Sequence, residues 1–468
     1  MSLTTAADAL YVSLDGALFM ASLAAPQHNP PDVGSLADLT TRQTRSSLEA
    51  RSISAVDACR FGDGFVRPAY EDFCFSNLPG LFEKLIFGST AKLSFPKEVS
   101  DKLGGYEHVI FAFVDAFGWE SFERFRDTSR FLKAVDRDGI VLKSTSQFPS
   151  TTAAHVSTIL SGLPVYDHGV CGWDYYEPRV GRMVKPLVYS FSEDKDPDTL
   201  RKAGFSPEQV LPRGHFLSNL RARDVHVELH GPAAYYPSPF NLRYSPIHSV
   251  YGYSSVREGV AGICESLLAK PGRSYHALYA DAYDSACHEF GVGAPQSDAV
   301  ATEILRSLGT FLNRSFPLRS LLVVSADHGQ IATPTGRKIS VNTLIPGLEK
   351  LLKLDIRGEP IRFSGGKRYL FLHPKDGHRE SLVQELRSKL HGAATVMTLA
   401  ELGAAGLLGP GPLKESFAER LGSVGILPHA GYSVHWYEPP MFDDKGLSGH
   451  GGLSPQEMET PVLFLPLS

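Results

Sequence analysis

Acidic and histidine side chains recur at short spacings that suit a metal site. Asp284 and His288 are four residues apart, so they share one face if this segment is a helix. Carboxylate oxygens and imidazole nitrogens are suitable ligands for zinc and similar divalent ions. The alternative is an exposed pair on a surface helix. Because the pair directly follows an apolar run, residues 275–280, its position favours metal binding.

A second pattern is the adjacent pair Asp327 and His328, which follows the apolar run 321–325 and precedes a glycine. An Asp-His pair at the end of a strand is unusual outside metal sites. Further along, His450 stands between two glycines, and a backbone without side chains on either side can bring a histidine close to a ligand. By itself, this glycine-rich segment is equally compatible with a flexible loop.

A third carboxylate, Asp115, follows the apolar run 108–114. A side chain at the carboxyl end of a buried parallel strand points into the crevice where α/β sheets bind ligands. The alternative is that Asp115 caps the helix that follows. A single aspartate does not distinguish between the two roles.

Hydroxyl groups gather at Ser150, Thr151 and Thr152, after a proline and before an Ala-rich stretch. This pattern indicates the start of a helix, where a Ser or Thr side chain commonly serves as the cap. The functional alternative is a threonine hydroxyl at the positive end of the helix, where the dipole, free N–H groups and a metal would stabilise its alkoxide.

Buried strands and helices alternate around these motifs. The apolar runs are continuous, as expected for strands covered on both faces. The sequence therefore predicts an α/β fold with a mostly parallel central sheet and helices on both faces. The expected strands are residues 108–114, 226–229, 275–280, 321–325 and 462–465, and the expected helices include residues 153–160, 256–268 and 297–313.

Two segments differ from this regular pattern. Residues 1–100 contain Pro-rich and polar patches (26–31 and 42–47) and are expected to wrap around the core. Residues 333–445 hold an extended run at 367–372, a helical run at 379–390 and a Gly/Pro turn. We interpret them as a small α+β cap inserted into a catalytic core made of residues 1–332 and 446–468.

Composition excludes several classes of function. The formal net charge is −5, from 46 basic and 51 acidic residues, and no long basic run suggests binding to a nucleic acid polymer. No apolar stretch approaches the ~20 residues that a membrane span needs. The five widely spaced cysteines and the absence of a charged signal-peptide start favour a cytoplasmic protein that is not attached to a membrane. The oligomeric state is not indicated.

Taken together, the motifs resemble the alkaline phosphatase superfamily, in the branch of type I phosphodiesterases and nucleotide pyrophosphatases. The family pattern runs in the same order along the chain, and it includes a nucleophilic threonine ten residues before the Gly of a Ser/Thr-Gly-Leu motif. The matching positions in this sequence are Asp115, Thr152 (with Gly162 ten residues later), Asp284, His288, Asp327, His328 and His450.

The resemblance implies two divalent metal ions, with zinc the expected metal. It assigns one ion to Asp284, His288 and His450. It assigns the other to Asp115, Asp327 and His328, together with the Thr152 oxygen. Three carboxylates and a threonine alkoxide would balance the four positive charges of two such ions, so the centre could accept an anionic ester.

The resemblance also implies that Thr152 forms a phospho- or nucleotidyl-threonine intermediate. Thr151 is the rival nucleophile and is disfavoured only by the spacing. Many relatives have an asparagine three residues after the nucleophile, where this sequence has His155; the expectation is that His155 binds the substrate, or else points away from it. Cys287 is expected to pack in the core rather than to bind a metal.

The expected substrate is a small phosphate ester, most plausibly a nucleotide diester or pyrophosphate. No arginine is embedded in the metal motifs, which mildly favours diesters over the more highly charged monoesters. A phosphomonoesterase, a phosphonate hydrolase and a non-catalytic binding protein on this scaffold are the alternatives. Aromatic residues near the motifs are candidates for stacking on a nucleobase, with core packing an equal possibility: Phe117, Trp119, Trp173, Tyr175 and Tyr176.

Overall fold

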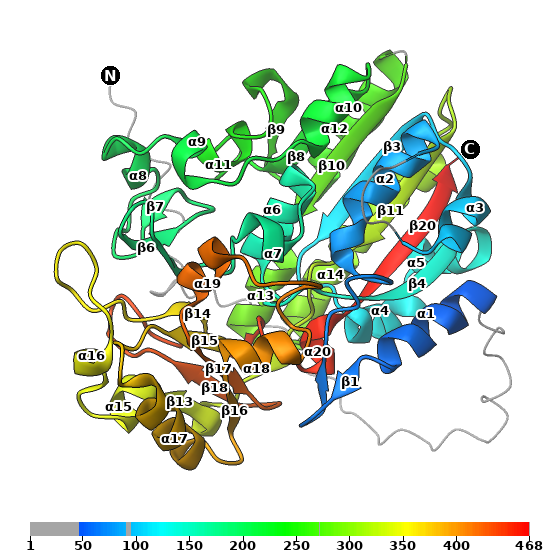
Figure 1. Cartoon of the computed structure of the whole chain (residues 1–468). Helices are drawn as coiled ribbons and strands as arrows, with labels where there is room; N and C mark the ends of the chain where they lie inside the picture. Colours follow the sequence, from blue (N-terminus) through cyan, green and yellow to red (C-terminus); the bar gives the residue numbers. More distant parts are fainter. Residues whose placement is uncertain (1–45, 90–94, 271, 468) are drawn as a thin grey trace, which may run out of the picture.

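The structure, a computed structural model, describes residues 46–89, 95–270 and 272–467. Its centre is a seven-stranded sheet that runs through the upper right of the molecule (Figure 1). In spatial order the strands are β4 (Ile140–Thr145), β20 (Glu459–Leu467), β11 (Ser320–Ser325), β3 (His108–Val114), β10 (Ser274–Ala280), β8 (His226–Pro232) and β9 (Val250–Tyr253).

The sheet is mostly parallel. Neighbouring strands from β11 to β9 pair in parallel, whereas β20 is antiparallel to both β11 and β4. Because β20 runs against the others, its first residue lies at the edge where the parallel strands end. This direction brings the segment before β20, which contains His450, to the same edge as Asp115 and Asp327.

Helices cover both faces of the sheet, and the side chains of each strand alternate between two apolar cores. In β3, Phe111 and Phe113 face one core, and Ile110 and Ala112 face the other. This double burial is the reason why the strand is a continuous apolar run. The first core is covered by α2 (Leu78–Phe87), α6 (Thr152–Ser161) and α10 (Phe216–Ala222), and the second by α4 (Trp119–Arg126), α5 (Arg130–Asp138), α12 (Val256–Ala269) and α14 (Pro295–Leu308).

The predicted fold class is confirmed, and most predicted elements lie close to observed ones. β3 has the predicted bounds, and the expected strand at 226–229 extends to Pro232. The expected helix at 297–313 is α14 followed by a 3₁₀ turn, η5 (Gly309–Asn313). β4 and β9 were not predicted, since β4 contains Lys143 and Ser144 and β9 has four residues.

A second lobe lies at the lower left of Figure 1 and contains a four-stranded antiparallel sheet. The chain passes between the lobes where β12 (Ile331–Ala332) pairs with β19 (Ser448–Gly449), directly beside the boundaries expected for the cap. The sheet order is β14 (Ser364–Gly366), β15 (Tyr369–Leu372), β17 (Val424–Pro428) and β16 (Ala394–Thr398). The lobe also holds α15 (Val341–Leu344), α16 (Leu348–Leu351), α17 (Arg379–Lys389), α18 (Leu399–Ala404) and α19 (Glu415–Leu421), with β13 (Lys338–Ser340) paired to β18 (Ser433–His435).

The expected extended run at 367–372 is a strand over its last four residues. Gly366 pairs with Tyr369, so Lys367 and Arg368 form a two-residue turn between β14 and β15. The side chains of both turn residues contribute to the site described below.

The wrapping segment expected at 1–100 lies partly outside the described residues, including the Pro-rich patch 26–31. Its described part contains α1 (Ser47–Asp57), which packs on β4, and α2 and α3 (Lys97–Leu103), which pack on each other. All five cysteines are free thiols. Within the described ranges, the search for a helix long and apolar enough to cross a membrane found none.

Candidate active site

Thr152 is the first residue of α6, directly after the extended residue Thr151. Its Oγ1 lies 3.3 Å from both carboxylate oxygens of Asp115 and 3.2 Å from Nε2 of His328. No side chain caps α6 with a hydrogen bond, and the hydroxyl of Ser150 instead donates to the carbonyl of Gly452 at 2.7 Å. The Thr152 hydroxyl is therefore directed at ligand-type side chains rather than at its own helix.

Asp115 sits just beyond β3, where the backbone turns sharply. The next residue, Ala116, has a φ of 62°, a left-handed conformation that costs a non-glycine residue on the order of 1 kcal/mol. This turn directs the Ala116 N–H to Oδ1 of Asp327 at 3.2 Å. Asp115 accepts a further hydrogen bond, 2.6 Å long, from the hydroxyl of Tyr279 on β10. Backbone and side chains thus hold the two carboxylates next to each other.

The three predicted histidine ligands share one orientation. In each, Nδ1 lies close to a backbone carbonyl: Ser448 for His288 at 3.0 Å, Gly329 for His328 at 3.0 Å and Ser150 for His450 at 3.2 Å. A carbonyl only accepts, so the proton of each neutral ring belongs on Nδ1. The lone pair on Nε2 is then free toward the centre, which is how histidines bound to metals are usually oriented.

The ligand atoms form two overlapping groups. Asp115, Asp327 and His328 offer atoms within 4.8 Å of one another, and this is the set that the resemblance assigns to one ion. Asp284, His328 and His450 form the other group, in which the rings of His328 and His450 stack with centroids 3.8 Å apart. His288 lies at the margin of that group, with its Nε2 3.4 Å from Oδ2 of Asp284.

This arrangement fits divalent cations on chemical grounds. The buried Oδ2 of Asp327 has no hydrogen-bond partner, although it lies 3.1 Å from the His328 Nε2 that bears a lone pair. Two acceptors that face each other at this distance call for a cation between them. Burial, together with the carboxylates of Asp327 and Asp284, raises the pKa of Asp115. Clustered buried carboxylates are expected where a metal compensates their charge.

The loop that carries His450 is held by a buried ion pair. Glu457 accepts hydrogen bonds from the backbone N–H of Gly452 at 2.9 Å and from Arg368 in the second lobe at 3.0 and 2.7 Å. Arg368 and Glu457 are both fully buried. Gly451 has a φ of 114°, and a Cβ there would lie 2.1 Å from the ring of Tyr369. This position therefore requires glycine.

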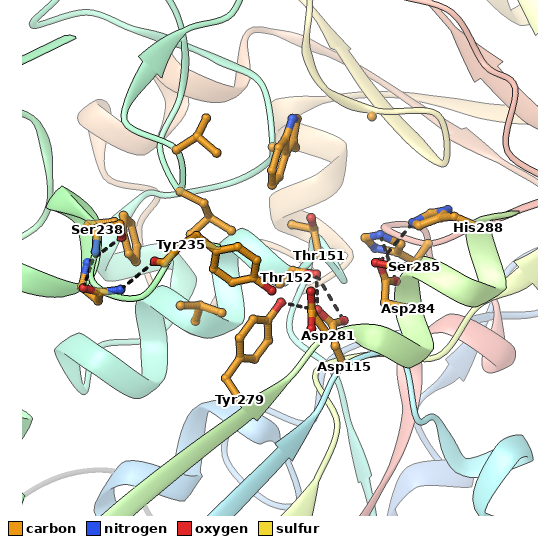
Figure 2. A pocket seen from close by; sticks show the side chains of 18 of the residues that line it. Asp115, Thr151, Thr152, Tyr235, Ser238, Tyr279, Asp281, Asp284, Ser285 and His288 are labelled. Carbon is orange, nitrogen blue, oxygen red and sulfur yellow. Dashed lines mark hydrogen bonds and ion pairs between the residues drawn. The ribbon is translucent and has the colours of Figure 1, made fainter. Parts of the chain in front are cut away.

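A cavity of about 430 Å³ opens in front of the cluster, within the range of ~300–1,000 Å³ typical of small-molecule sites. Figure 2 shows Asp115 and Thr152 near its centre, Asp284 and His288 on one side, and Tyr235 and Ser238 on the other. Much of its wall is apolar and comprises Val156, Leu160, Trp173, Leu187, Val188 and Phe240.

One cationic side chain from the second lobe reaches the cavity. Lys367, in the turn between β14 and β15, lines it together with Asp284 and His288. Its Nζ lies 3.1 Å from Oδ1 of Asp444, which Lys338 also approaches at 3.4 Å. Burial lowers the pKa of Lys367, and Asp444 opposes this effect.

His155 is not among the residues that line the cavity. Its side chain is fully buried and its ring packs edge-on against Phe75, with centroids 4.8 Å apart. Nε2 accepts from the backbone N–H of Gln147 at 3.0 Å, and Nδ1 donates to the carbonyl of Thr151 at 2.8 Å. Burial lowers the pKa of His155 to about 4, so the ring is neutral near pH 7. Both ring nitrogens hold the turn before α6.

Of the aromatic candidates, Trp173 lines the cavity and is 45% exposed. Phe117 and Trp119 pack in the core beneath the sheet, and Tyr175 is fully buried. Tyr176 packs edge-on against His373. Cys287 is buried in the same core as Phe117 and is not a member of the candidate metal ligand groups.

Sequence reasoning missed three residues of the site. Tyr279 and Lys367 had no motif around them. Gln330 stands three residues after Asp327, and its amide donates to Oδ1 of Asp284 at 2.5 Å. Its place two residues after the Asp-His pair was the available signal that it supports a ligand.

Comparison with known proteins agrees with this geometry. Residues 109–449 match the family of type I phosphodiesterases and nucleotide pyrophosphatases. A search of the curated proteins found no significant match.

Solved structures with the same fold include murine ectonucleotide pyrophosphatase/phosphodiesterase 5. It has a TM-score of 0.56 at 17% sequence identity, over 76% of this chain and 87% of that chain. The human protein of the same name has a TM-score of 0.56 at 16% identity, with coverages of 76% and 87%. Phosphonoacetate hydrolase from Sinorhizobium meliloti 1021 has a TM-score of 0.52 at 16% identity, with coverages of 76% and 89%. At these identities the likeness shows a shared fold.

The family match spans most of the chain, from the first strand of the sheet to the residue before His450. It includes Asp115, Thr152, Asp284 and Asp327, which the fold brings to one edge of the sheet. The resemblance to the alkaline phosphatase superfamily is thereby confirmed, and the chain belongs to its type I phosphodiesterase and nucleotide pyrophosphatase family.

Proposed function

We propose that the protein hydrolyses small phosphodiesters or pyrophosphates of nucleotides, with Thr152 as the nucleophile and two divalent cations, best matched by zinc, at the cluster. The observation that carries this proposal is the position of the Thr152 hydroxyl. It lies between Asp115 and His328 at the start of α6, and Thr152 lines a cavity with a largely apolar wall.

The ligands present suit two cations. Asp115, Asp327 and His328 would hold one cation beside the Thr152 oxygen, and Asp284, His288 and His450 would hold the other. When bound, the cations would supply Lewis-acid stabilisation of the threonine alkoxide, the leaving oxygen and the attacking water.

The chain's own groups then have defined roles in an in-line displacement. Thr152 Oγ1, without its proton, forms a bond to phosphorus while the bond from phosphorus to the leaving oxygen breaks. The start of α6 places the positive end of the helix dipole beside the transferred group. In the second step, water attacks phosphorus, the bond to Thr152 breaks, and the hydroxyl is restored.

The cavity favours an ester with a large organic group. Its apolar wall and the half-exposed Trp173 can pack against a nucleobase, which the small substrates of a phosphonate hydrolase would not require. The solved structure of an inactive variant of the murine protein in complex with AMP supports a nucleotide as the substrate class. Phosphonate hydrolysis is the second candidate, because Lys367 adds a cation that a second anionic group would attract.

The decisive experiment compares Thr152→Ala with Thr151→Ala in zinc-loaded protein. The substrates are a nitrophenyl-nucleotide diester, nitrophenyl phosphate and phosphonoacetate. We expect Thr152→Ala to lower kcat on the diester by at least about 10⁴-fold with unchanged metal content, and Thr151→Ala to lower it far less. Retained turnover in Thr152→Ala would remove this residue as the nucleophile. Much faster cleavage of the monoester or the phosphonate would reject the diester assignment.

A further inference from the structure

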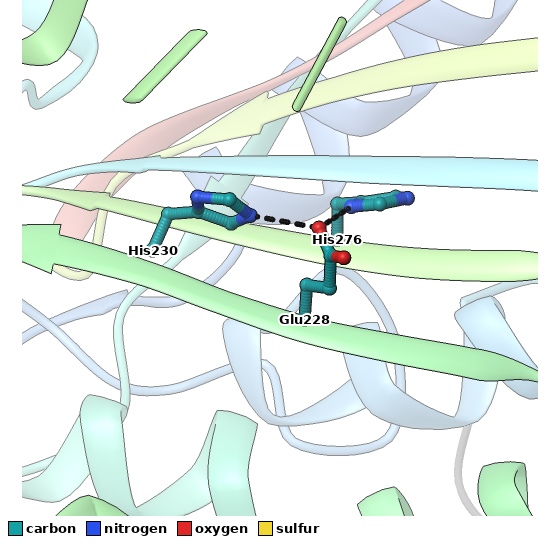
Figure 3. Close-up of side chains that lie close together, drawn as sticks. All are labelled: Glu228, His230 and His276. Carbon is teal, nitrogen blue, oxygen red and sulfur yellow. Dashed lines mark hydrogen bonds and ion pairs between the residues drawn. The ribbon is translucent and has the colours of Figure 1, made fainter. Parts of the chain in front are cut away.

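A second group of ligand-type side chains lies on the central sheet, separate from the candidate active site. Glu228 and His230 come from β8, and His276 comes from the neighbouring strand β10. The three are buried, with at most 5% exposure, and their ligand atoms lie within 4.8 Å of one another. Figure 3 shows both imidazoles pointing toward the carboxylate.

Strand pairing explains why these side chains meet. β8 and β10 are parallel, and their register places His276 directly beside Glu228. His230 is two residues after Glu228, so it projects from the same face of the sheet. Val227 and Leu229 face the opposite core, and α12 covers the face that carries the cluster. The group is thus enclosed between the sheet and a helix.

One carboxylate oxygen is the point where the group converges. Oε2 of Glu228 lies 3.1 Å from Nε2 of His230 and 3.1 Å from Nδ1 of His276. The other oxygen, Oε1, is occupied elsewhere, since it accepts from Ser266 Oγ at 2.9 Å and from Lys270 Nζ at 2.6 Å. It also lies 2.7 Å from Nε2 of the half-buried His226.

The remaining nitrogen of His276 is also held in place, because its Nε2 lies 3.0 Å from Oγ of Ser274. Metal-binding carboxylates and histidines characteristically have their non-ligating atoms fixed by hydrogen bonds in this way. In this cluster the atoms that would bind a metal converge, and the second atoms of Glu228 and His276 are engaged with other side chains.

A buried nitrogen without a partner points to a ligand. Nδ1 of His276 has no hydrogen-bond partner, although it is close to Glu228 Oε2. The two atoms are near enough for a hydrogen bond but are not aligned for one, as expected when both point to a common position. Buried polar atoms are almost always satisfied, so this one requires an explanation such as an ion.

The charges around the group suit a cation. Glu228 is the acidic side chain of the group, and one imidazole nitrogen of each histidine lies beside its Oε2. Lys270 is 43% exposed and contacts the oxygen that would not bind the ion.

We propose that Glu228, His230 and His276 bind one divalent transition-metal ion, with zinc the best match for two imidazole nitrogens and one carboxylate oxygen. Water would complete a tetrahedral set. The ion would link β8 to β10, and through Ser266 and Glu228 it would also fasten α12 to the sheet. Its role is structural, and it does not depend on the proposed reaction.

The competing occupant is a proton, which would leave a purely hydrogen-bonded network. To distinguish the two, the full-length protein is incubated with zinc, freed of excess metal and analysed by mass spectrometry. We expect His230→Gln to hold one equivalent of zinc less than the wild type, and to keep its ester-hydrolysis kcat within about twofold. Equal zinc in the two proteins would overturn the proposal.

The matched control is Asp327→Asn, which removes a ligand of the candidate active site. We expect it to lose activity and the cation that Asp115, Asp327 and His328 would hold, while it retains the ion at Glu228. The double variant His230→Gln/Asp327→Asn should show both losses added together. This pattern distinguishes a failure of the proposed structural site from a failure of the proposed catalytic centre.

A second measurement covers the case in which His230→Gln does not fold. Cobalt(II) is titrated into Asp284→Asn/Asp327→Asn, which lacks a ligand of each proposed active-site cation and leaves the β8–β10 cluster intact. We expect intense visible absorption typical of tetrahedral cobalt, together with a rise in the thermal midpoint. The absence of both signals would show that a hydrogen-bond network is all that the cluster forms.

Discussion

Breaking the buried pair between Arg368 and Glu457 should damage both stability and the metal centre. Both side chains are fully buried, and Glu457 receives two hydrogen bonds from Arg368 and three from the loop after His450. In Arg368→Met, the carboxylate keeps the three loop contacts but loses the guanidinium that compensates its charge. Removing one partner of a buried pair typically costs about 3–5 kcal/mol.

The partner variant tests whether the cost comes from the pair. Glu457→Gln leaves the guanidinium of Arg368 buried beside a neutral amide, so we expect a similar loss of stability. The double variant Arg368→Met/Glu457→Gln should be less destabilised than the sum of the single variants, by about 2 kcal/mol, because the second change removes a charge that the first has left unpaired. Urea unfolding of the metal-free proteins measures these differences.

The functional consequence follows from the position of the pair. Glu457 fixes the backbone of Gly452, two residues from His450, so loosening this loop should weaken the ion that His450 would hold. Loss of such supporting contacts typically costs ~10–100-fold in metal affinity or activity. Competition with a chelator measures the affinity. Arg387→Met is the control, because its exposed pair with Glu401 should contribute less than about 1 kcal/mol. An Arg368→Met protein with wild-type stability and metal affinity would refute this reasoning.

Three further predictions concern the cavity, the core and the His450 loop. Lys367→Met should lower kcat/KM for nitrophenyl phosphate by about 10–100-fold, and less for the nucleotide diester, because the monoester carries more charge. Lys338 still pairs with Asp444, so the fold should persist. Equal losses for the two substrates would contradict a direct contact between Lys367 and the substrate charge. Burial lowers the pKa of His168 to about 3, whereas the unfolded-state value is near 6.5, so below pH 6.5 the unfolded chain binds one proton more than the folded protein. The free energy of unfolding should therefore decrease by about 1.4 kcal/mol for each unit by which the pH decreases. His168→Asn should reduce this slope in urea unfolding between pH 6.5 and 4. Gly451→Ala places a Cβ against the ring of Tyr369, which should displace the loop that carries His450. We therefore expect at least about tenfold weaker metal binding in chelator competition. A metal affinity equal to that of the wild type would show that the loop can adapt.

The features that could be predicted from the sequence are those that depend on local chemistry and on the architecture of parallel sheets. The apolar runs before Asp115, Asp284 and Asp327 mark strands buried on both faces, and the ends of parallel strands meet at one edge. Carboxylates that follow those runs must therefore approach one another, and their assembly could be anticipated from order and spacing. The local signature of a helix start predicted hydroxyl groups at residues 150–152, and the spacing of the resembled family favoured Thr152 over Thr151 as the nucleophile.

The sequence did not predict features that depend on the packing of one element against another. His155 has the same spacing from Thr152 as the family's asparagine, yet its ring turns into the core, because Phe75 and the backbone of Gln147 provide a buried position for it. Lys367 and Arg368 appeared to belong to a strand. The register of β14 with β15 places them in a turn, from which they reach the cavity and Glu457.

The sequence alone determined the fold class, the order of the motifs and the chemical nature of the candidate ligands, because burial pattern and side-chain chemistry are local properties. The tertiary structure alone decided which distant residues meet. Glu228 and His276 are 48 positions apart and carry no shared motif, and they lie together because β8 pairs with β10 in one register. Strand order and register are set by the packing of the whole sheet, and so a search for short motifs does not detect them.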